Sequence, residues 1–372
     1  MFSSIAHPTG PSFVLARPDR VIESFGTRKS FTNPHTAADA LRAGEVSALV
    51  GALAFDPVQP CALAEPRELR HQNTRWTYAP APGTSNTRGR VGAAIFEPDD
   101  ATHALRVRDL LEVIDQGRLE KIVLSRKALV TSIDPLNPHE VLGRLVDADA
   151  NGNGYLVDLG GDVLVGSSPE VLIRRQGTTV SCHPLAGSAR RNSDPERDAR
   201  IGANLLASTK DRHEHAFVVE AIRKALAPLC SDLDIADAPT LTTTPQLWHL
   251  GTPVTGVLSD PRVTALDLAL AIHPTPAVNG TPFTASLEEL RRIEPDRGFY
   301  AGAVGWCDSN GDGEWIVAIR CARISADRLS ATAYAGGGIV AGSDPKREVS
   351  ETLTKFRTVL AALGSDSSNL EW

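Results

Sequence analysis

Residues 329–363 read LSATAYAGGGIVAGSDPKREVSETLTKFRTVLAAL, and this stretch decides the fold class. Segment 329–335 is β-rich and predicts a strand, and the glycine-rich run 335–340 predicts a loop. A helix start signal follows at residues 343–345, and a helix is predicted over 345–363. Its apolar side chains recur at helical spacing at Val349, Leu353, Phe356, Val359 and Leu360. A strand that leads into an amphipathic helix predicts layers of sheet and helix.

The same mixture continues through the rest of the chain. Further helices are predicted at 101–117, 138–146 and 211–229. Further β-rich segments are predicted at 46–55, 122–125, 155–167 (a hairpin turning at Gly160 and Gly161), 171–174, 248–257, 301–306 and 316–322. Residues 80–90 predict a surface loop. Since no repeat or linker divides the chain, residues 1–372 predict one large α+β domain, with two intimately packed lobes as the alternative.

Composition excludes several classes of function. The 372 residues are 42% apolar and 22% charged, which is typical of a globular protein, and the net charge is −7. An acidic surface argues against nucleic-acid and anionic-membrane partners, so a small anionic substrate would need local cations or a metal. The five scattered cysteines predict free thiols. Neither a signal peptide nor a membrane-spanning run is evident, which predicts a cytoplasmic protein.

Two predicted helices each carry a pair of carboxylates three residues apart. Asp211 and Glu214 form one pair, and Glu348 and Glu351 form the other, with Lys355 one turn further along. Residues at this spacing share one helix face. A hard divalent cation would neutralise such a pair, and ligation by oxygen alone favours Mg²⁺ over zinc. The alternative for each pair taken alone is a solvated helix face.

Two single residues are candidates for proton transfer. Lys121 directly precedes an apolar strand, where it can be partly desolvated and act as a base, and Glu170 begins a strand after a turn. Position alone also fits an ordinary surface residue at both places. Residues 308–313 imitate the start of an EF-hand loop, but Ile319 stands where the bidentate glutamate is needed, so this segment predicts a tight turn.

Eight short motifs occur in order along the C-terminal two thirds of the chain. They are KIVLSR at 121–126, SPEVL at 168–172, PLAGS at 184–188, STKDRHEH at 208–215, HPTPAV at 273–278, RGFYAGAVG at 297–305, AGGGIV at 335–340, and SDP at 343–345 continuing through Glu348, Glu351 and Lys355. With these motifs, residues 101–363 resemble the chorismate-utilising enzymes of menaquinone, siderophore and tryptophan biosynthesis. Residues 1–100 match only diffusely, as expected of a part that mainly builds the scaffold.

The resemblance implies one α/β domain with two large sheets flanked by helices and a site in a cleft between the layers. Glu214 and Glu348 match the Mg²⁺ ligands of the family, and Asp211 and Glu351 match positions that hold metal-bound water. Magnesium would chelate the ring carboxylate of chorismate. The remaining positions that match substrate-binding or pocket-lining residues of the family are Gly187, His249, Tyr300, Arg320, Gly338 and Lys355.

The resemblance also implies a reaction. Lys121 matches the lysine that activates water, where anthranilate synthases have a non-basic residue, and Glu170 matches the general acid. Ala186 stands where aminodeoxychorismate synthases carry a nucleophilic lysine. The implied activity is therefore Mg²⁺-dependent isomerisation of chorismate to isochorismate by water addition and loss of the ring hydroxyl. No glutaminase subunit is expected, and a monomer is the default.

The product at which the reaction stops depends on two residues. Ala277 and Val278 are similar to the alanine and bulky aliphatic residue of family members that release isochorismate, whereas salicylate synthases have threonine and a small residue there. Salicylate synthase, which also eliminates pyruvate, is the main alternative. Asn279 departs from the small residue that is usual at its position. An inactive ligand-binding homologue is the minor alternative, and the complete set of base, acid and metal positions argues against it.

Overall fold

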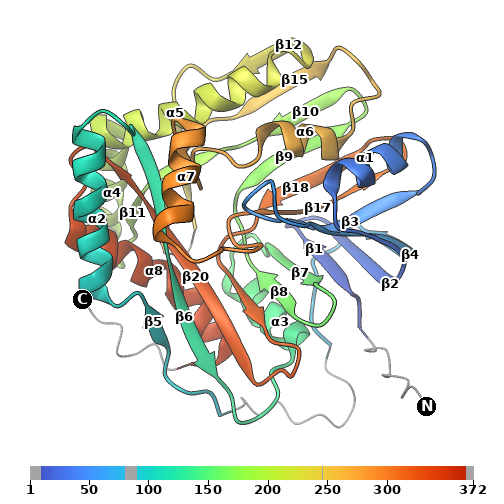
Figure 1. The fold of residues 1–372 in the computed structure, drawn as a ribbon, viewed down its shortest axis with the longest axis horizontal. Helices are drawn as coiled ribbons and strands as arrows, with labels where there is room; N and C mark the ends of the chain where they lie inside the picture. The colour runs from blue at the N-terminus through green and yellow to red at the C-terminus, as the bar shows by residue number, and fades with distance from the viewer. Residues whose placement is uncertain (1–9, 80–89, 245, 366–372) are drawn as a thin grey trace.

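The computed structural model describes residues 10–79, 90–244 and 246–365, which form helices around two sheets (Figure 1). Of the loop predicted at 80–90, all but the last residue lies outside this part. The helices are α1 (Pro34–Arg42), α2 (Asp100–Asp115), α3 (Pro138–Ala148), α4 (Pro195–Ala207), α5 (Thr209–Leu226), α6 (Ala265–Ile272), α7 (Phe283–Ile293) and α8 (Pro345–Leu363). No helix of the described residues is long and apolar enough to cross a membrane.

Within the described residues the larger sheet has 17 strands, and all of its pairings there are antiparallel. Neighbour by neighbour they are β12 (Cys230–Ile235), β15 (Val254–Leu258), β10 (Thr179–Cys182), β9 (Val171–Gln176), β18 (Gly313–Val317), β17 (Ala303–Asp308), β3 (Ala48–Leu53), β4 (Ala62–Gln72), β2 (Val21–Phe31), β1 (Phe13–Ala16), β7 (Gly154–Asp158), β8 (Val163–Gly166), β19 (Cys321–Ile324), β20 (Ser330–Val340) and β6 (Lys121–Thr131). Strands β16 (Gly280–Thr281) and β5 (Ile95–Glu97) both pair with the outer edge of β6.

The smaller sheet has three strands, in the order β11 (Leu185–Arg190), β14 (Leu247–Gly251) and β13 (Thr240–Thr243). The prediction of an α+β protein with two sheets and flanking helices is confirmed, although the strands divide unequally between the sheets. Strands β1 to β4, from the first hundred residues, lie in the middle of the large sheet. This part of the chain therefore joins the two halves of the sheet, in keeping with a scaffolding role.

Two hydrophobic cores lie on opposite faces of the same strands. On β1, Phe13 and Leu15 belong to the larger core, while Val14 and Ala16 belong to the smaller one. This division follows from the alternation of side chains along a strand. Helices α3 and α8 cover the smaller core, and α5, α6 and α7 supply residues of the larger one. Strand β1 is thus buried on both faces.

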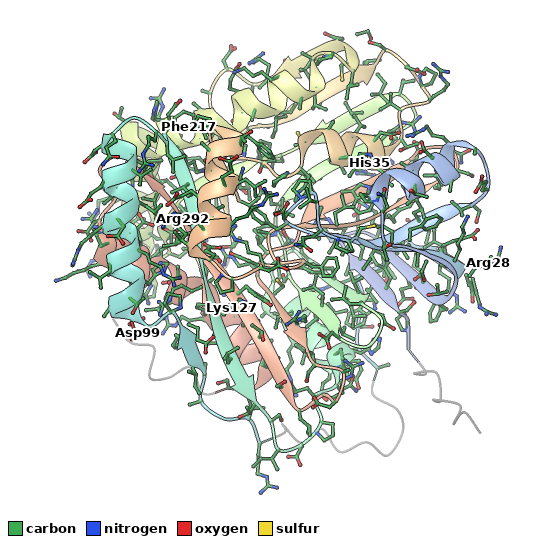
Figure 2. The ribbon with its side chains drawn as sticks, in the orientation of Figure 1. Arg28, His35, Asp99, Lys127, Phe217 and Arg292 are labelled. Carbon is green, nitrogen blue, oxygen red and sulfur yellow. The ribbon has the colours of Figure 1, made fainter. Side chains whose placement is uncertain are left out.

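Local signals explain where the helices begin and end. Helix α8 has the predicted bounds, because Asp344 caps its first turn by accepting from the Arg347 amide at 2.9 Å and Gly364 ends it with a left-handed φ of 89°. Asp99, at the start of α2 in Figure 2, accepts from the Thr102 amide in the same way at 2.8 Å. Helix α5 covers Thr209–Leu226 rather than 211–229. Helices α1, α4, α6 and α7 were not predicted.

The glycine-rich run 335–340 is not a loop. It forms the second half of β20 and pairs residue for residue with β6, from Arg126 opposite Ala335 to Lys121 opposite Val340. Glycine has low strand propensity, but here a long partner strand supplies the hydrogen bonds. The tight turn predicted at 308–313 is confirmed, since it joins β17 to β18. All five cysteines are free thiols, as predicted.

Candidate active site

A cavity of about 540 Å³ lies beside β6 and β20, between the two sheets and helices α5 and α8. It brings together nearly all of the predicted site residues, although they come from distant parts of the chain. Those that line it are Glu170, Gly187, Asp211, Glu214, His249, Ala277, Val278, Tyr300, Arg320, Gly338, Glu348, Glu351 and Lys355. Lys121 does not line the cavity directly, and its side chain contacts Glu214.

Gly336 and Gly338 of β20 line the cavity, and the side chains of three residues approach this glycine-rich stretch closely. A β-carbon at Gly338 would lie 2.2 Å from Glu214 Oε1, and one at Gly336 would lie 2.9 Å from the Tyr300 hydroxyl. A β-carbon at Gly337 would lie 3.0 Å from Glu348 Oε2. Bare backbone is therefore required for the carboxylates of α5 and α8 to come this close to the strand.

Helix α5 contributes the first carboxylate pair from its first two turns. Glu214 is buried, and its Oε1 lies 3.0 Å from Lys121 Nζ. The Lys121 side chain is itself only 1% exposed at the start of β6, so this is an ion pair inside the protein. Burial raises the pKa of Asp211, and the neighbouring Glu214 and Glu351 add to that effect. In the α5 pair Glu214 is therefore buried and Asp211 half-buried, so this is not a solvated helix face.

Helix α8 contributes the second pair, and the two members have opposite pKa shifts. Burial and then the charge of Glu351 raise the pKa of Glu348 to about 8. Burial would raise the pKa of Glu351 too, but Lys355, Ser188 and Lys210 together outweigh burial, and the pKa is lowered. Ser188 also donates to Glu351, at 3.2 Å, and Lys210 Nζ lies 3.8 Å from Glu348. At neutral pH Glu348 is therefore mostly protonated and Glu351 is ionised beside Lys355, because two neighbouring buried carboxylates do not both carry charge unaided.

The donor set fits a hard divalent cation. All four side chains offer oxygen, and Glu348 Oε2 is buried without a hydrogen-bond partner among the described residues. No three of the described acidic or histidine groups converge on one point as they stand. Lys121 and Lys210 lie among these carboxylates, and their ammonium groups pair with Glu214 and Glu348. A cation would replace the charge that these lysines provide.

Glu170 is the one carboxyl of the cavity that lies apart from this cluster. It precedes β9, is 4% exposed, and accepts a long hydrogen bond of 3.5 Å from the Leu185 amide. Burial raises its pKa to about 7, against the opposing effects of that amide and of Lys121, Lys355 and Arg320. A carboxyl with this pKa is protonated in a large fraction of molecules at neutral pH, as a proton donor must be.

Three further side chains give the cavity its cationic and aromatic surface. Arg320 has a left-handed φ of 53° in the turn between β18 and β19, and no carboxylate of the described chain lies within ion-pair distance of it. Tyr300 stacks on Tyr334, with ring centroids 5.0 Å apart. Burial, then the charges of Arg320 and Lys355, lower the pKa of His249 well below its usual range, so this ring is neutral. A buried, unpaired guanidinium is suited to bind a carboxylate.

Sequence reasoning missed several residues of the site. Ser188, Lys210, Tyr334 and Arg347 all line the cavity, and only the motif letters around Ser188 and Lys210 pointed to them. Asn279, in contrast, does not line it. This side chain is fully buried, and its amide nitrogen donates to the Phe283 carbonyl at 3.1 Å.

Comparison with known proteins gives the same family throughout. Residues 62–364 match the model of the chorismate binding enzymes. The chain is 48% identical to a Mycobacterium tuberculosis protein provisionally named isochorismate synthase MenF (96% of this chain, 97% of the relative) and 41% identical to isochorismate synthase DhbC of Bacillus subtilis (95% and 94%). A crystal structure from Bacillus anthracis, provisionally described as a 2,3-dihydroxybenzoate-specific isochorismate synthase DhbC, superimposes with a TM-score of 0.88 at 37% identity (97% of this chain, 98% of that chain). This family is consistent with a small-molecule substrate and a divalent metal cofactor. The chain therefore belongs to the chorismate binding enzymes.

Proposed function

We propose that this chain is an isochorismate synthase, which converts chorismate to isochorismate with Mg²⁺. The observation that carries the proposal is the cavity, in which a buried carboxyl with a pKa of about 7 lies across from two helices that bear four carboxylates. Its volume of about 540 Å³ is within the usual range for a small-molecule site. The names of the relatives, which match over almost the whole chain, support the same activity.

Glu214 and Glu348 would hold the metal directly, and Asp211 and Glu351 would do so through water. Bound Mg²⁺ would supply a Lewis acid for the ring carboxylate of chorismate. Lys121 and Lys210 would then give up their pairing with Glu214 and Glu348. Lys121 is thereby left as the buried base, at the start of a strand whose full-length pairing with β20 fixes its place.

The reaction needs one proton removed and one delivered. Lys121 takes a proton from the water that attacks the ring carbon next to the carboxylate-bearing carbon. Glu170 donates its proton to the hydroxyl that departs across the ring, and the ring double bonds shift. The pKa of about 7 supports this role for Glu170, since the side chain is available in both protonation states near neutral pH. The same two groups can act in the opposite sense, so the reaction is reversible.

The remaining predicted residues would bind and shape the substrate. Arg320 and Tyr300 would hold the enolpyruvyl carboxylate, with help from Lys355 and the Gly338 backbone, because the guanidinium is free of carboxylate partners in the described chain. The side chains or backbone of Gly187, His249, Ala277 and Val278 complete the wall. We propose one catalytic domain over residues 1–372. A monomeric state, a cytoplasmic location and the lack of a glutaminase subunit stay predictions.

The test is to incubate purified protein with chorismate and Mg²⁺ and to separate the products by chromatography. We expect isochorismate in equilibrium with remaining chorismate, and no turnover after chelation of the metal. Salicylate with pyruvate as the main products would contradict release of isochorismate and would favour the salicylate synthase alternative. Absence of turnover with Mg²⁺ present would refute the proposed activity.

A further inference from the structure

One edge of β6 has a gap in its strand pairing beside the cavity. Strand β16 pairs with Lys121 and Ile122, and β5 pairs with residues 127–129, but no strand of the described chain pairs with this edge between them. Buried backbone groups nevertheless need partners. The Val123 amide donates to the Asn279 carbonyl at 2.8 Å. The Val123 carbonyl and the Ser125 amide bond instead to side chains, those of Arg297 and Glu294.

Arg297 and Glu294 form a buried ion pair that fills this gap. Both side chains are 3% exposed, and the guanidinium Nε and Nη2 lie 2.6 and 3.0 Å from the two carboxylate oxygens. The hydroxyl of Ser125 donates to the same carboxylate at 2.8 Å. The guanidinium carbon lies 4.3 Å from the centre of the Phe55 ring. Each partner is therefore held in a single orientation.

The same guanidinium joins two walls of the cavity. Its Nη2 donates to the Val123 carbonyl at 2.6 Å, and its Nη1 donates to the Val278 carbonyl at 2.8 Å. Val123 and Val278 both line the cavity, Val123 two residues from Lys121 and Val278 directly after Ala277. A planar guanidinium can hold a carboxylate and two carbonyls at fixed angles, which an ammonium cannot do.

We propose that the Arg297–Glu294 pair is a positioning element that sets the spacing between the strand of Lys121 and the wall formed by Ala277 and Val278, and thereby keeps the reaction from proceeding to pyruvate elimination. This inference rests on the proposed function. Elimination from isochorismate breaks the ether bond of the enolpyruvyl group and moves the ring hydrogen beside it to the enolpyruvyl methylene. The products are salicylate and pyruvate, so no further reactant is needed.

This elimination requires the enolpyruvyl group to swing over the ring. If the wall formed by Ala277 and Val278 is held close to the ring, the enolpyruvyl group has no space to adopt this conformer. If the wall can move away from the ring, the conformer becomes accessible. Loosening the wall would also move the ring relative to Lys121. Misplacement by about 1 Å can lower a rate by about a hundredfold, so both the rate and the product should respond.

The test compares Arg297→Lys and Ser125→Ala with the native protein. Arg297→Lys keeps the positive charge but loses the planar guanidinium. Ser125→Ala removes one hydrogen-bond donor to Glu294 and leaves no buried charge unpaired, so it can still test the inference if Arg297→Lys does not fold. For Arg297→Lys we expect kcat per folded molecule to fall about tenfold or more, KM to change by less than about threefold, and pyruvate and salicylate to appear. Ser125→Ala should lower kcat and release pyruvate and salicylate in the same way, but to a smaller extent.

Arg291→Lys is the matched control. Arg291, on helix α7, makes a similar two-pronged pair with Asp56, and among the described residues its side chain bonds to none that lines the cavity. It should leave kcat and products unchanged. If folded Arg297→Lys or Ser125→Ala kept native kcat and released no pyruvate, the pair would be structural only and the inference would be wrong. Lack of isochorismate from the native protein would instead contradict the proposed function, so the two failures are distinguishable.

Discussion

Replacing Glu170 by glutamine should make the protein more stable at alkaline pH while removing its activity. Burial raises the pKa of this side chain from the 4.5 of an exposed glutamate to about 7, so the folded protein keeps a proton there that the unfolded chain has already released. The protonated Glu170 carboxyl therefore adds to the free energy of unfolding. This contribution is fully present below pH 4.5 and is lost as the pH rises through 7. Glutamine has a similar shape and never ionises.

The size of the effect follows from the two pKa values. With about 1.36 kcal/mol for each tenfold change in proton affinity, ionising the buried carboxyl costs roughly 3 kcal/mol at pH 8 and roughly 1 kcal/mol at pH 5. Glu170→Gln should therefore gain about 2 to 3 kcal/mol relative to the native protein between these two pH values. Packing differences between the side chains are present at both pH values and cancel in the comparison.

The assay is urea unfolding of both proteins at pH 5 and pH 8, followed by circular dichroism. Glu112→Gln, on the exposed face of α2, is the control and should follow the native protein. In parallel, Glu170→Gln should lose about 10² to 10⁴ of its kcat, the usual contribution of a general acid. A difference in unfolding free energy that is the same at both pH values would show that Glu170 is not held protonated, and its assignment as the acid would fall.

Three other outcomes are expected. Lys121→Ala should lower kcat by about 10² to 10⁴. It should not weaken Mg²⁺ binding measured by calorimetry, because it frees Glu214 from its ion pair. The control Lys127→Ala, farther along β6 (Figure 2), should have nearly native kcat, and a larger loss of kcat in Lys127→Ala than in Lys121→Ala would exclude Lys121 as the base. Arg320→Lys should raise KM for chorismate about tenfold or more with a smaller change in kcat, and an unchanged KM would contradict its role as carboxylate ligand. Millimolar Mg²⁺ should raise the thermal unfolding temperature of the native protein but not of Glu348→Gln, since the cation neutralises buried carboxylates; equal shifts would place the metal elsewhere.

Sequence reasoning succeeded where the deciding signals are local. The start of helix α8 was predicted from its capping aspartate and the proline that follows it, and its extent from apolar residues at helical spacing. The run 335–340 was wrongly predicted as a loop because its strand character comes from β6, some two hundred residues earlier. The glycines there are explained by Glu214 and Tyr300, which approach from elsewhere in the fold. No local pattern could have revealed that approach.

In the site, too, the sequence predicted local patterns but not the contacts between distant parts of the chain. The spacing of Asp211, Glu214, Glu348 and Glu351 predicted two acidic helix faces, and only the resemblance to a family of enzymes joined them into one site. The burial of Lys121 and its contact with Glu214 depend on the pairing of β6 with β20 and on the position of α5. The raised pKa of Glu170 is likewise a property of its surroundings and not of its motif.

The central place of the first strands in the large sheet has a consequence for synthesis of the protein. Gly51 on β3 pairs with Gly305 on β17, so roughly 250 residues must be translated before this pairing can form. At ordinary elongation rates β3 waits about 12 to 50 s for that partner. During this time its apolar residues and open edge are available to chaperones and to other nascent chains. A fragment that ends before β17 should therefore aggregate when expressed alone. The yield of folded full-length protein should depend on the rate of translation and not only on the stability of the folded state.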